Sequence, residues 1–290
     1  MQLSHILTGL VVSLYASSAQ AQIVTVPWPT PSAKSLQIFM GYGVVNSTGT
    51  RFNWYANQLD DLSRFSVALP SQGCAVRDTT TNTARLHNCA AAVNFGYFQF
   101  SAKPTYCLGN IVVNESLVLW SGDGNPMMAM TNTKTTIMGV LSKSDIAKYG
   151  VTYAASGFGT IVLDGQVNQA GIERTKKAIK ALRPTAEEIA PRTVAGLDAQ
   201  GRLFLVAIDG VESLDLGLTI DETAEIFASG SIGFPYKLQH AINFDGGGST
   251  TMSTSPLWPL PAQIFNRPTD TDLGPISERD VTTIACIKGE

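Results

Sequence analysis

The sequence TVAGLDAQGRLFLVAI, residues 193–208, decides the fold class. Two apolar runs, Thr193 to Leu197 and Leu203 to Ile208, flank a polar segment from Asp198 to Arg202. Short runs rich in β-branched and aromatic residues, bounded by polar turn residues, are typical of strands. The stretch therefore predicts two strands joined by a tight turn, and the rest of the chain can be assigned outward from it.

Similar short apolar runs occur on both sides of this unit. The runs at 53–56 and 65–69 are separated by the polar residues 60–63, and we expect them to pair with each other. A run at 160–163 leads into Asp164-Gly165, a dipeptide typical of hairpin turns. The other expected strands are 90–93, 241–244 and 281–287, of which the last would close the sheet.

Helix signals are fewer than strand signals. Thr219 lies three residues before Glu222, which is the spacing of a capping box, and an apolar helical face follows. That face consists of Ile220, Ala224 and Phe227. A second pair, Thr185 and Glu188, indicates a short helix after Pro184. Because strands dominate and do not alternate strictly with helices, we predict a single α+β domain with a mixed, mainly antiparallel sheet and a few packed helices.

The N-terminal residues 1–21 are expected to be a signal peptide. An apolar run from 6 to 16 precedes Ala19-Gln20-Ala21, which has the form of a cleavage site. The alternative is an N-terminal membrane anchor, but the run is short for a bilayer span. Residues 22–35 are rich in proline and predict an extended lead-in without regular structure. The folded domain would be 36–290, without a membrane span, secreted or in the lumen of the secretory pathway.

The composition excludes several kinds of protein. Hydrophobic residues make up 44% of the 290 and charged residues 15%, as in a folded chain. The formal net charge of −3 gives no support for a nucleic-acid partner. Three histidines without a carboxylate pattern disfavour a catalytic zinc site, and neither a GxSxG nor a GxxxxGK[ST] motif occurs. We therefore expect no metal and no cofactor; the oligomeric state is left open.

The cysteines agree with export from the cytosol. Their even number and the lack of a CxxC pair predict two disulfides, for which three connectivities are possible. The four are Cys74, Cys89, Cys107 and Cys286. Glycosylation sequons begin at Asn46 and Asn114, and we expect them to be used where the host glycosylates exported proteins.

The segment DGGGST at residues 245–250 follows the expected strand 241–244 directly. Consecutive glycines cost backbone entropy, but they allow amides to approach a ligand closely and to form an anion-binding nest. Asp245 would point into the same crevice. The alternative is a flexible turn with a capping aspartate. The position of the loop favours a site, with Asp245 as a catalytic carboxylate and Gly246, Gly247, Gly248, Ser249 and Thr250 against the substrate.

Asp209-Gly210 ends another apolar strand and supplies a second candidate carboxylate, although the same dipeptide is common in hairpin turns. Arg192 leads into a strand. Arg279 and the pair Asn266-Arg267 lie among turn residues. Such arginines either bind an anion or are solvated surface charges.

The segment Asn94-Phe95-Gly96-Tyr97-Phe98 places a side-chain amide beside aromatic rings and a glycine. An aromatic face suits the stacking of a pyranose, so Asn94, Gly96 and Phe98 are candidates for a sugar-binding wall. Packing in the core is the alternative.

Together these segments resemble the phosphodiester glycosidase family over roughly residues 52–287. The motifs that carry the resemblance are Asn94 to Phe98, Cys107 to Asn110, Arg192-Thr193, Asp209-Gly210, Asp245 to Ser249, and Arg279 with Val281. The resemblance implies a pocket of acids and glycines that hydrolyses a sugar–phosphate link. It also implies the disulfides Cys74–Cys107 and Cys89–Cys286.

Two departures from the family pattern stand out. Phe95 replaces a second glycine, which is expected to reshape the sugar pocket. The cysteine-rich modules and membrane anchor of animal members have no counterpart in this sequence, so their retention in the Golgi is not carried over.

The expected function is hydrolysis of a sugar-1-phosphodiester that resembles an N-acetylglucosamine-1-phosphodiester. Arg192, Arg279 and the amides of Gly246 to Ser249 would hold the phosphate. Asp245 and Asp209 would serve as base, nucleophile or oxocarbenium stabiliser, and Asn94 would orient a sugar hydroxyl or acetamido group. The alternatives are a binding module for sugar phosphates or anionic glycans, and a metal-dependent phosphodiesterase with Asp209 and Asp245 as ligands.

Overall fold

The computed structural model describes residues 22–101, 105–122, 124–183, 188–255, 260–270 and 276–289. The signal peptide expected at 1–21 lies outside the described residues, and so do 184–187, where the helix after Pro184 was expected.

The described strands form three sheets, whose ladders are all antiparallel. The seven-stranded sheet has the order β12 (Gln166–Val167), β11 (Gly159–Leu163), β15 (His240–Asn243), β13 (Arg192–Leu197), β14 (Leu203–Ile208), β3 (Arg51–Leu59), β2 (Leu36–Val44). The six-stranded sheet has the order β1 (Val24–Pro27), β9 (Thr135–Gly139), β8 (Met127–Thr131), β10 (Val151–Ser156), β6 (Ile111–Val113), β7 (Ser116–Leu119). The five-stranded sheet has the order β17 (Gln263–Ile264), β16 (Met252–Thr254), β5 (Cys89–Asn94), β18 (Ile284–Lys288), β4 (Phe65–Ala68).

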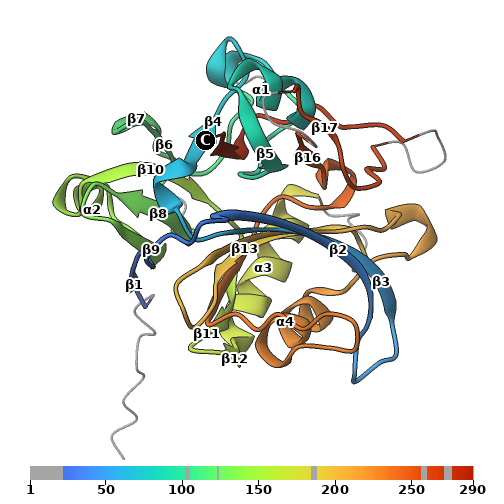
Figure 1. Ribbon diagram of the computed structural model, residues 1–290. Coiled ribbons are helices and arrows are strands. Elements are labelled where there is room, and N and C mark those ends of the chain that lie inside the picture. Colours follow the sequence, from blue (N-terminus) through green and yellow to red (C-terminus); the bar gives the residue numbers. More distant parts are fainter. Residues whose placement is uncertain are drawn as a thin grey trace, which may run out of the picture.

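Helices cover the outer faces of these sheets. The described α-helices are α1 (Thr80–Leu86), α2 (Lys143–Lys148), α3 (Gln169–Leu182) and α4 (Ile220–Ser229). Four 3-10 turns are η1 (Leu62–Arg64), η2 (Gly73–Ala75), η3 (Glu212–Leu214) and η4 (Gly247–Ser249). The helices α3 and α4 pack on the seven-stranded sheet, α1 on the five-stranded sheet and α2 on the six-stranded sheet (Figure 1).

The main core lies where the three sheets meet. Buried side chains come from all three, among them Leu205 of β14, Val93 of β5 and Met128 of β8. A second core fills the space between the seven-stranded sheet and helices α3 and α4, with Phe227 and Phe204 fully buried. One domain with shared cores results, so the predicted α+β class is confirmed, although the strands form three sheets instead of one.

Two strand pairs joined by a turn and one helix cap, which were predicted from residues close in the chain, are confirmed. The strands β13 and β14 pair in register from Arg192 with Ile208 to Leu197 with Leu203, which confirms the two strands joined by a turn that were predicted within residues 193–208. Helix α4 begins at the predicted capping box of Thr219 and Glu222. The hairpin after β11 turns at Asp164-Gly165, with φ of 51° and 73°.

Three predictions about pairing are wrong, because pairing depends on distant segments. The strands β3 and β4 do not pair: β3 lies between β14 and β2, and β4 pairs with β18. The strand β18 lies inside the five-stranded sheet instead of closing it. The lead-in 22–35 is extended, but Val24–Pro27 forms an edge strand on β9, where a proline can be tolerated.

Both disulfides have the connectivity that the family resemblance implied. Cys74 is bonded to Cys107 and Cys89 to Cys286, with Cα separations of 5.2 and 5.5 Å. The sequons Asn46 and Asn114 lie exposed in turns, after β2 and after β6 respectively. Among the described residues, none of the helices has the length and apolarity needed to span a bilayer.

Candidate active site

The site lies where the carboxyl ends of β15 and β5 meet the start of β13, between the seven-stranded and five-stranded sheets. Asp245 follows β15, and its backbone joins the segment after β5: Asp245 N donates to Phe95 O at 3.0 Å, and Asn94 Nδ2 donates to Asp245 O at 2.7 Å. The strand-end aspartate is thereby held at a junction of two sheets. It lines a cavity of about 150 Å³ that is open to solvent.

Each glycine of the loop allows a different close approach. A Cβ at Gly246 would lie 2.8 Å from Pro191 O. At Gly247, where φ is +61°, it would overlap the carboxylate of Glu212, and at Gly248 it would overlap the guanidinium of Arg279. The glycines therefore let one carboxylate and one guanidinium pack directly on the loop.

The predicted anion nest is only partly present. The amide of Gly247 donates to Pro191 O at 2.8 Å, and that of Ser249 donates to Gly246 O at 3.3 Å. Two of the four amides assigned to phosphate are thus engaged by the backbone. This part of the prediction is wrong because the Gly247 amide is bonded to the segment before β13 and the Ser249 amide is used within the loop at the 3-10 turn η4.

Asp245 has an unusual environment for a carboxylate. Its Oδ2 atom is buried without a hydrogen-bond partner among the described residues. Burial raises the pKa of Asp245 to about 6, and this effect outweighs the Ser249 hydroxyl and the charges of Arg279 and Arg183, which lower it. A carboxyl group that changes its charge near pH 6 beside two guanidinium groups is suited to catalysis.

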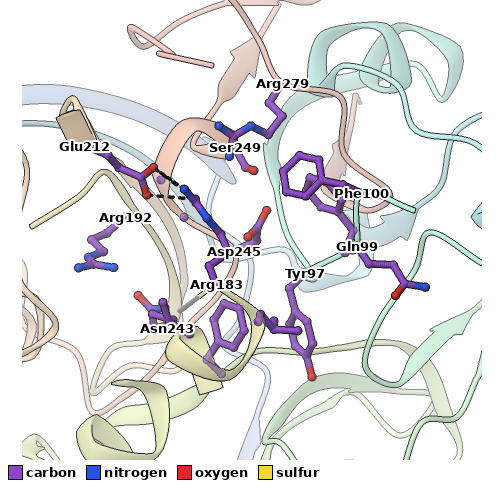
Figure 2. A pocket seen from close by; sticks show the side chains of 16 residues that line it. Tyr97, Gln99, Phe100, Arg183, Arg192, Glu212, Asn243, Asp245, Ser249 and Arg279 are labelled. Carbon is purple, nitrogen blue, oxygen red and sulfur yellow. Dashed lines mark hydrogen bonds and ion pairs between the residues drawn. The ribbon is translucent and has the colours of Figure 1, made fainter. Parts of the chain in front are cut away.

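Arg183 and Glu212 form an ion pair at the edge of the same cavity. Arg183 directly follows α3, and Glu212 is the first residue of η3; the Nη1 and Nη2 atoms lie 3.3 Å from Oε2 (Figure 2). The side chain of Glu212 is only 12% exposed, whereas that of Arg183 is 41% exposed. The arginine can therefore swing toward a ligand while the carboxylate stays on Gly247.

Arg279 reaches the cavity from the segment before β18. Its Nε donates to Asp270 Oδ1 at 2.6 Å and its Nη2 to Asp270 O at 3.3 Å, which fixes the direction of the guanidinium. The group also lies 5.7 Å from the centre of the Phe100 ring. Arg279 therefore lines the same cavity as Asp245.

Aromatic side chains form the opposite wall. Tyr97, Phe98, Phe100 and Phe158 line the cavity, and the Tyr97 ring stacks on Phe158 at 4.5 Å. Phe98 is 9% exposed and Phe100 is 59% exposed, so Phe100 presents its ring at the rim.

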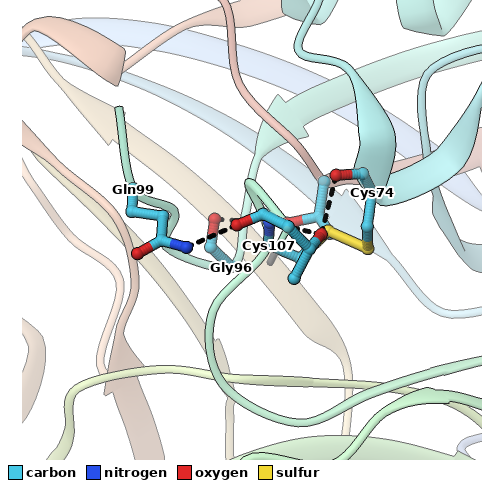
Figure 3. Close-up of a disulfide and its surroundings, with 6 residues drawn as sticks. Cys74, Gly96, Gln99 and Cys107 are labelled. Carbon is cyan, nitrogen blue, oxygen red and sulfur yellow. Dashed lines mark hydrogen bonds between the residues drawn. A yellow bond between two sulfur atoms is a disulfide. The ribbon is translucent and has the colours of Figure 1, made fainter. Parts of the chain in front are cut away.

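Figure 3 shows the disulfide Cys74–Cys107 close to Gly96 and Gln99 of the segment that carries this wall. Gln99, which lines the cavity, donates through its side-chain amide to Thr105 O, and the Thr105 hydroxyl donates to Cys74 O at 2.7 Å. The bond therefore tethers the aromatic segment to η2.

Arg192 also lines the cavity, but its guanidinium is used in the fold. Its Nε donates to Leu218 O at 2.8 Å and its Nη2 to Glu188 O. Burial lowers the pKa of Arg192 to about 10. These bonds connect β13 to the segments around it, so the Arg192 guanidinium is not available to a ligand. The second arginine available in the cavity, beside Arg279, is Arg183, which was not predicted from the sequence.

Asn94 is a structural residue in this geometry. It is fully buried, and its Oδ1 accepts from the Thr193 hydroxyl at 2.8 Å and from Thr251 N at 3.0 Å. Gly96 and Thr250 are likewise buried and do not line the cavity. All three were predicted to contact the sugar. Instead, Asn94 and Thr250 connect the glycine loop to β5 and β13, and Gly96 O accepts from the Thr283 hydroxyl at 3.2 Å.

Asp209 lines a second pocket together with Arg267, apart from the cavity of Asp245. Its Oδ1 accepts from Asn266 Nδ2 at 2.9 Å and from Arg267 N at 3.2 Å. Asn266 Nδ2 also donates to Thr250 O at 3.0 Å. The grouping of Asp209, Asn266 and Arg267 with Asp245 is therefore wrong: β14, which precedes Asp209, is separated by β13 from β15, which precedes Asp245, and the two acids line different pockets.

Within the described ranges, no cluster of three or more His, Cys, Asp or Glu side chains could hold a metal ion. Glu212 and Arg183 carried no sequence signal that distinguishes them from solvated charges. The only hint was the glycine at 247, whose missing side chain makes room for Glu212.

The model of the phosphodiester glycosidase family matches residues 87–288, which include Asp245, the glycine loop and Arg279. The chain belongs to this family. Other members are similar in sequence. The human N-acetylglucosamine-1-phosphodiester alpha-N-acetylglucosaminidase is 29% identical over 204 residues, which cover 67% of this chain and 38% of the human protein. The mouse enzyme of the same name is 30% identical over 203 residues, 66% of this chain and 38% of that protein.

The aligned region thus spans well under half the length of these two phosphodiester glycosidases. The fold is similar to that of the zebrafish catalytic domain of the same enzyme, auto-inhibited by its propeptide. The TM-score is 0.75 at 24% identity, covering 93% of this chain and 88% of that chain.

Phe95, which departs from the family pattern, does not line the cavity. The residue is fully buried and its ring stacks on Phe244 at 3.9 Å. The expectation that it reshapes the sugar pocket is wrong, because its side chain points into the core between the sheets.

Proposed function

We propose that the protein hydrolyses a sugar-1-phosphodiester, releases the sugar and leaves a phosphomonoester. The observation that supports this most is the position of Asp245. It is a desolvated carboxyl group with a pKa of about 6, in a cavity that also contains the guanidinium groups of Arg183 and Arg279. Membership of the phosphodiester glycosidase family supports the same reaction.

The two arginines have the charge that the phosphate requires. A phosphate diester carries one negative charge, and its leaving group acquires a second as the bond to the sugar breaks. Arg279, held by Asp270, and Arg183, held by Glu212, would stabilise that developing charge. Because a phosphate monoester is a good leaving group, strong general-acid assistance is less necessary than in hydrolysis of an ordinary glycoside.

Asp245 would act in its ionised form at the anomeric carbon, either activating water or attacking directly. Burial weakens the solvation of its charge and so makes it a stronger base at neutral pH. The anomeric configuration of the first product, followed by NMR, distinguishes activation of water, which inverts, from direct attack, which retains.

The sugar would bind against the aromatic wall. Tyr97 and Phe158 present stacked rings inside the cavity, and Phe100 presents its ring at the rim. The names of the relatives make an N-acetylglucosamine-like sugar the first candidate.

An oxidising compartment suits the two disulfides. We therefore propose that residues 1–21 are removed as a signal peptide and that residues 36–290 are the enzyme domain. The protein would act after export, where Asn46 and Asn114 can be glycosylated.

The test is a product assay on a panel of sugar-1-phosphodiesters with the wild type and Asp245→Asn. We expect free reducing sugar from the wild type and a loss of at least about a thousandfold in kcat for Asp245→Asn. Asp209→Asn is the matched control: it changes a similar strand-end acid in the other pocket and should retain activity.

Two results would contradict the proposal. Inorganic phosphate or a phosphorylated sugar as the first product, with sensitivity to chelators, would indicate a metal-dependent phosphodiesterase. Affinity for the diesters without turnover by the wild type would indicate a binding module.

A further inference from the structure

A second pocket is separated from the candidate active site by the segment around η3. Glu212 of this segment lines the Asp245 cavity, whereas Val211 and Leu214 line the second pocket. Thr269 lines the second pocket too, and its carbonyl lies close to Gly248 on the other side. The pocket has a volume of about 500 Å³ and is open to solvent.

One side of this pocket is the solvent face of the β2–β3 hairpin. Tyr42 is paired with Asn53, and Arg51 lies two residues before Asn53 on the same face. All three are exposed, and Tyr42 is 51% exposed. The Tyr42 ring, the Asn53 amide and the Arg51 guanidinium therefore lie on one face of the hairpin, which lines the pocket.

The opposite side is a rigid segment that carries a second arginine. Arg267 N donates to Asp209 Oδ1, and the neighbouring Asn266 is buried and bonded to Asp209, Thr250 and Met252. The Arg267 side chain lies exposed at the pocket. Among the described residues neither Arg267 nor Arg51 takes part in an ion pair.

The carboxylate of Asp209 is engaged by hydrogen bonds. It accepts from Asn266, from Arg267 N and from the hydroxyl of Tyr55. Desolvation raises the pKa of Asp209 despite these bonds. The lining carries the guanidinium groups of Arg51 and Arg267 against this one carboxylate, so its net charge is positive and favours an anion.

The rim of the pocket is apolar and exposed. Leu214, Leu216 and Ile276 are 55%, 52% and 56% exposed. Large apolar side chains around a concave site mark surfaces that bind apolar groups. A neutral sugar or a free inorganic anion would leave this rim in water.

We propose that the second pocket binds a phosphate monoester carried on an apolar group. The dianionic phosphate lies between Arg51 and Arg267, and the apolar group lies on Leu214, Leu216 and Ile276. Two guanidinium groups match the two charges of a phosphate monoester. The site is separate from the Asp245 cavity, so the inference does not depend on the proposed hydrolysis.

The test is titration of the full chain with hexyl phosphate, followed by calorimetry and by NMR shifts of backbone amides. Hexanoate, hexyl glucoside and inorganic phosphate are the comparison ligands. We expect hexyl phosphate to bind at least about tenfold more tightly than each of them and to shift the amides of Tyr42, Asn53 and Arg267.

Variants separate the two parts of the site. Arg51→Ala with Arg267→Ala should lower the affinity for hexyl phosphate at least about tenfold, whereas Lys143→Ala on α2 should not change it. Leu214→Ser with Leu216→Ser should lower the affinity several-fold, with Ile264→Ser, an exposed residue of β17, as control. Each change is at an exposed side chain, so folding should be retained.

Three outcomes would overturn the proposal. The first is shifts confined to Gly247, Ser249 and Arg279, which would place the ligand in the other cavity. The second is affinity that does not respond to loss of both arginines. The third is equal affinity for inorganic phosphate and hexyl phosphate, because the apolar rim would then contribute nothing.

Discussion

Burial of Asp245 lowers the stability of the folded protein at neutral pH. Its pKa of about 6 in the folded chain lies above the ordinary aspartate value of about 3.9, because burial disfavours the charged form. The folded state therefore binds its proton more tightly than the unfolded state. Stability is lost as the pH rises from about 4 to about 6, and the whole penalty is present at neutral pH.

We accordingly predict that Asp245→Asn stabilises the protein at pH 7.5 by up to about 3 kcal/mol, from a shift of roughly two pKa units. Below about pH 4 the gain should vanish, since the wild-type carboxyl is then protonated in both states. Urea unfolding of both proteins across this pH range measures the difference. A variant less stable than wild type at pH 7.5 would contradict the explanation.

The same group sets a pH dependence for turnover. If the ionised carboxylate acts, kcat/KM should rise as the pH increases through about 6 and then level. Glu212→Gln should move this inflection to lower pH, because the negative charge of Glu212 raises the pKa of Asp245. Rates that fall over the same range would mean that Asp245 acts as an acid.

Gly247 offers a test of the loop at one residue. Gly247→Ala should reduce kcat/KM at least about tenfold, because its Cβ would displace Glu212 and so release Arg183. Gly49→Ala is the matched control: Gly49 also has a positive φ, of 76°, but a Cβ there meets nothing within 4 Å. Both variants should lose about 1–2 kcal/mol of stability, and equal activities would refute the role of the contact.

At the scale of elements, the aromatic wall depends on a short covalent link. The disulfide Cys74–Cys107 spans 33 residues and holds the segment that carries Tyr97 to Phe100 through Thr105. The helix α3, by contrast, contributes to the site only through its last turn, where Leu182 and then Arg183 reach the cavity. The wall and the ion pair therefore depend on different elements.

We predict that replacing Cys74 and Cys107 by serine raises KM several-fold with a smaller change in kcat, since the sugar-binding wall loosens. The control is the same change at Cys89 and Cys286. That pair spans 197 residues, and its loss should cost more stability, about 5 against about 4 kcal/mol by loop entropy. Steady-state kinetics, measured below the melting temperatures of both variants, gives the two KM values. A larger increase in KM for the Cys89 and Cys286 variant would contradict the role of Cys74–Cys107 in holding the sugar-binding wall.

At the scale of the whole molecule, three antiparallel sheets share one core and the candidate active site lies at a seam between two of them. The long disulfide Cys89–Cys286 joins the neighbouring strands β5 and β18 of the five-stranded sheet. Two pockets open on opposite sides of the η3 segment, which separates Asp245 from Asp209. This separation gives the protein room for two independent binding events.

The local sequence determined the elements. The strands at 193–208, the capped helix at 220–229 and the strand-end aspartate at 245 follow from periodicity, capping and glycine chemistry within a few residues. The family resemblance added the cysteine pairing. The strands, the capped helix and the strand-end aspartate could be predicted because their physical causes act between residues that are close in the chain.

Only the tertiary structure decided which elements meet. In the folded protein β3 and β4 do not pair, the Asn94 side chain is buried and hydrogen-bonded to Thr193, and Asp209 lines a different pocket from Asp245. The tertiary structure also brought Arg183 and Glu212 onto the glycine loop, although neither differs in sequence from a solvated surface charge. The physical reason is that strand pairing and burial depend on packing between distant segments, and no periodicity along the chain records it.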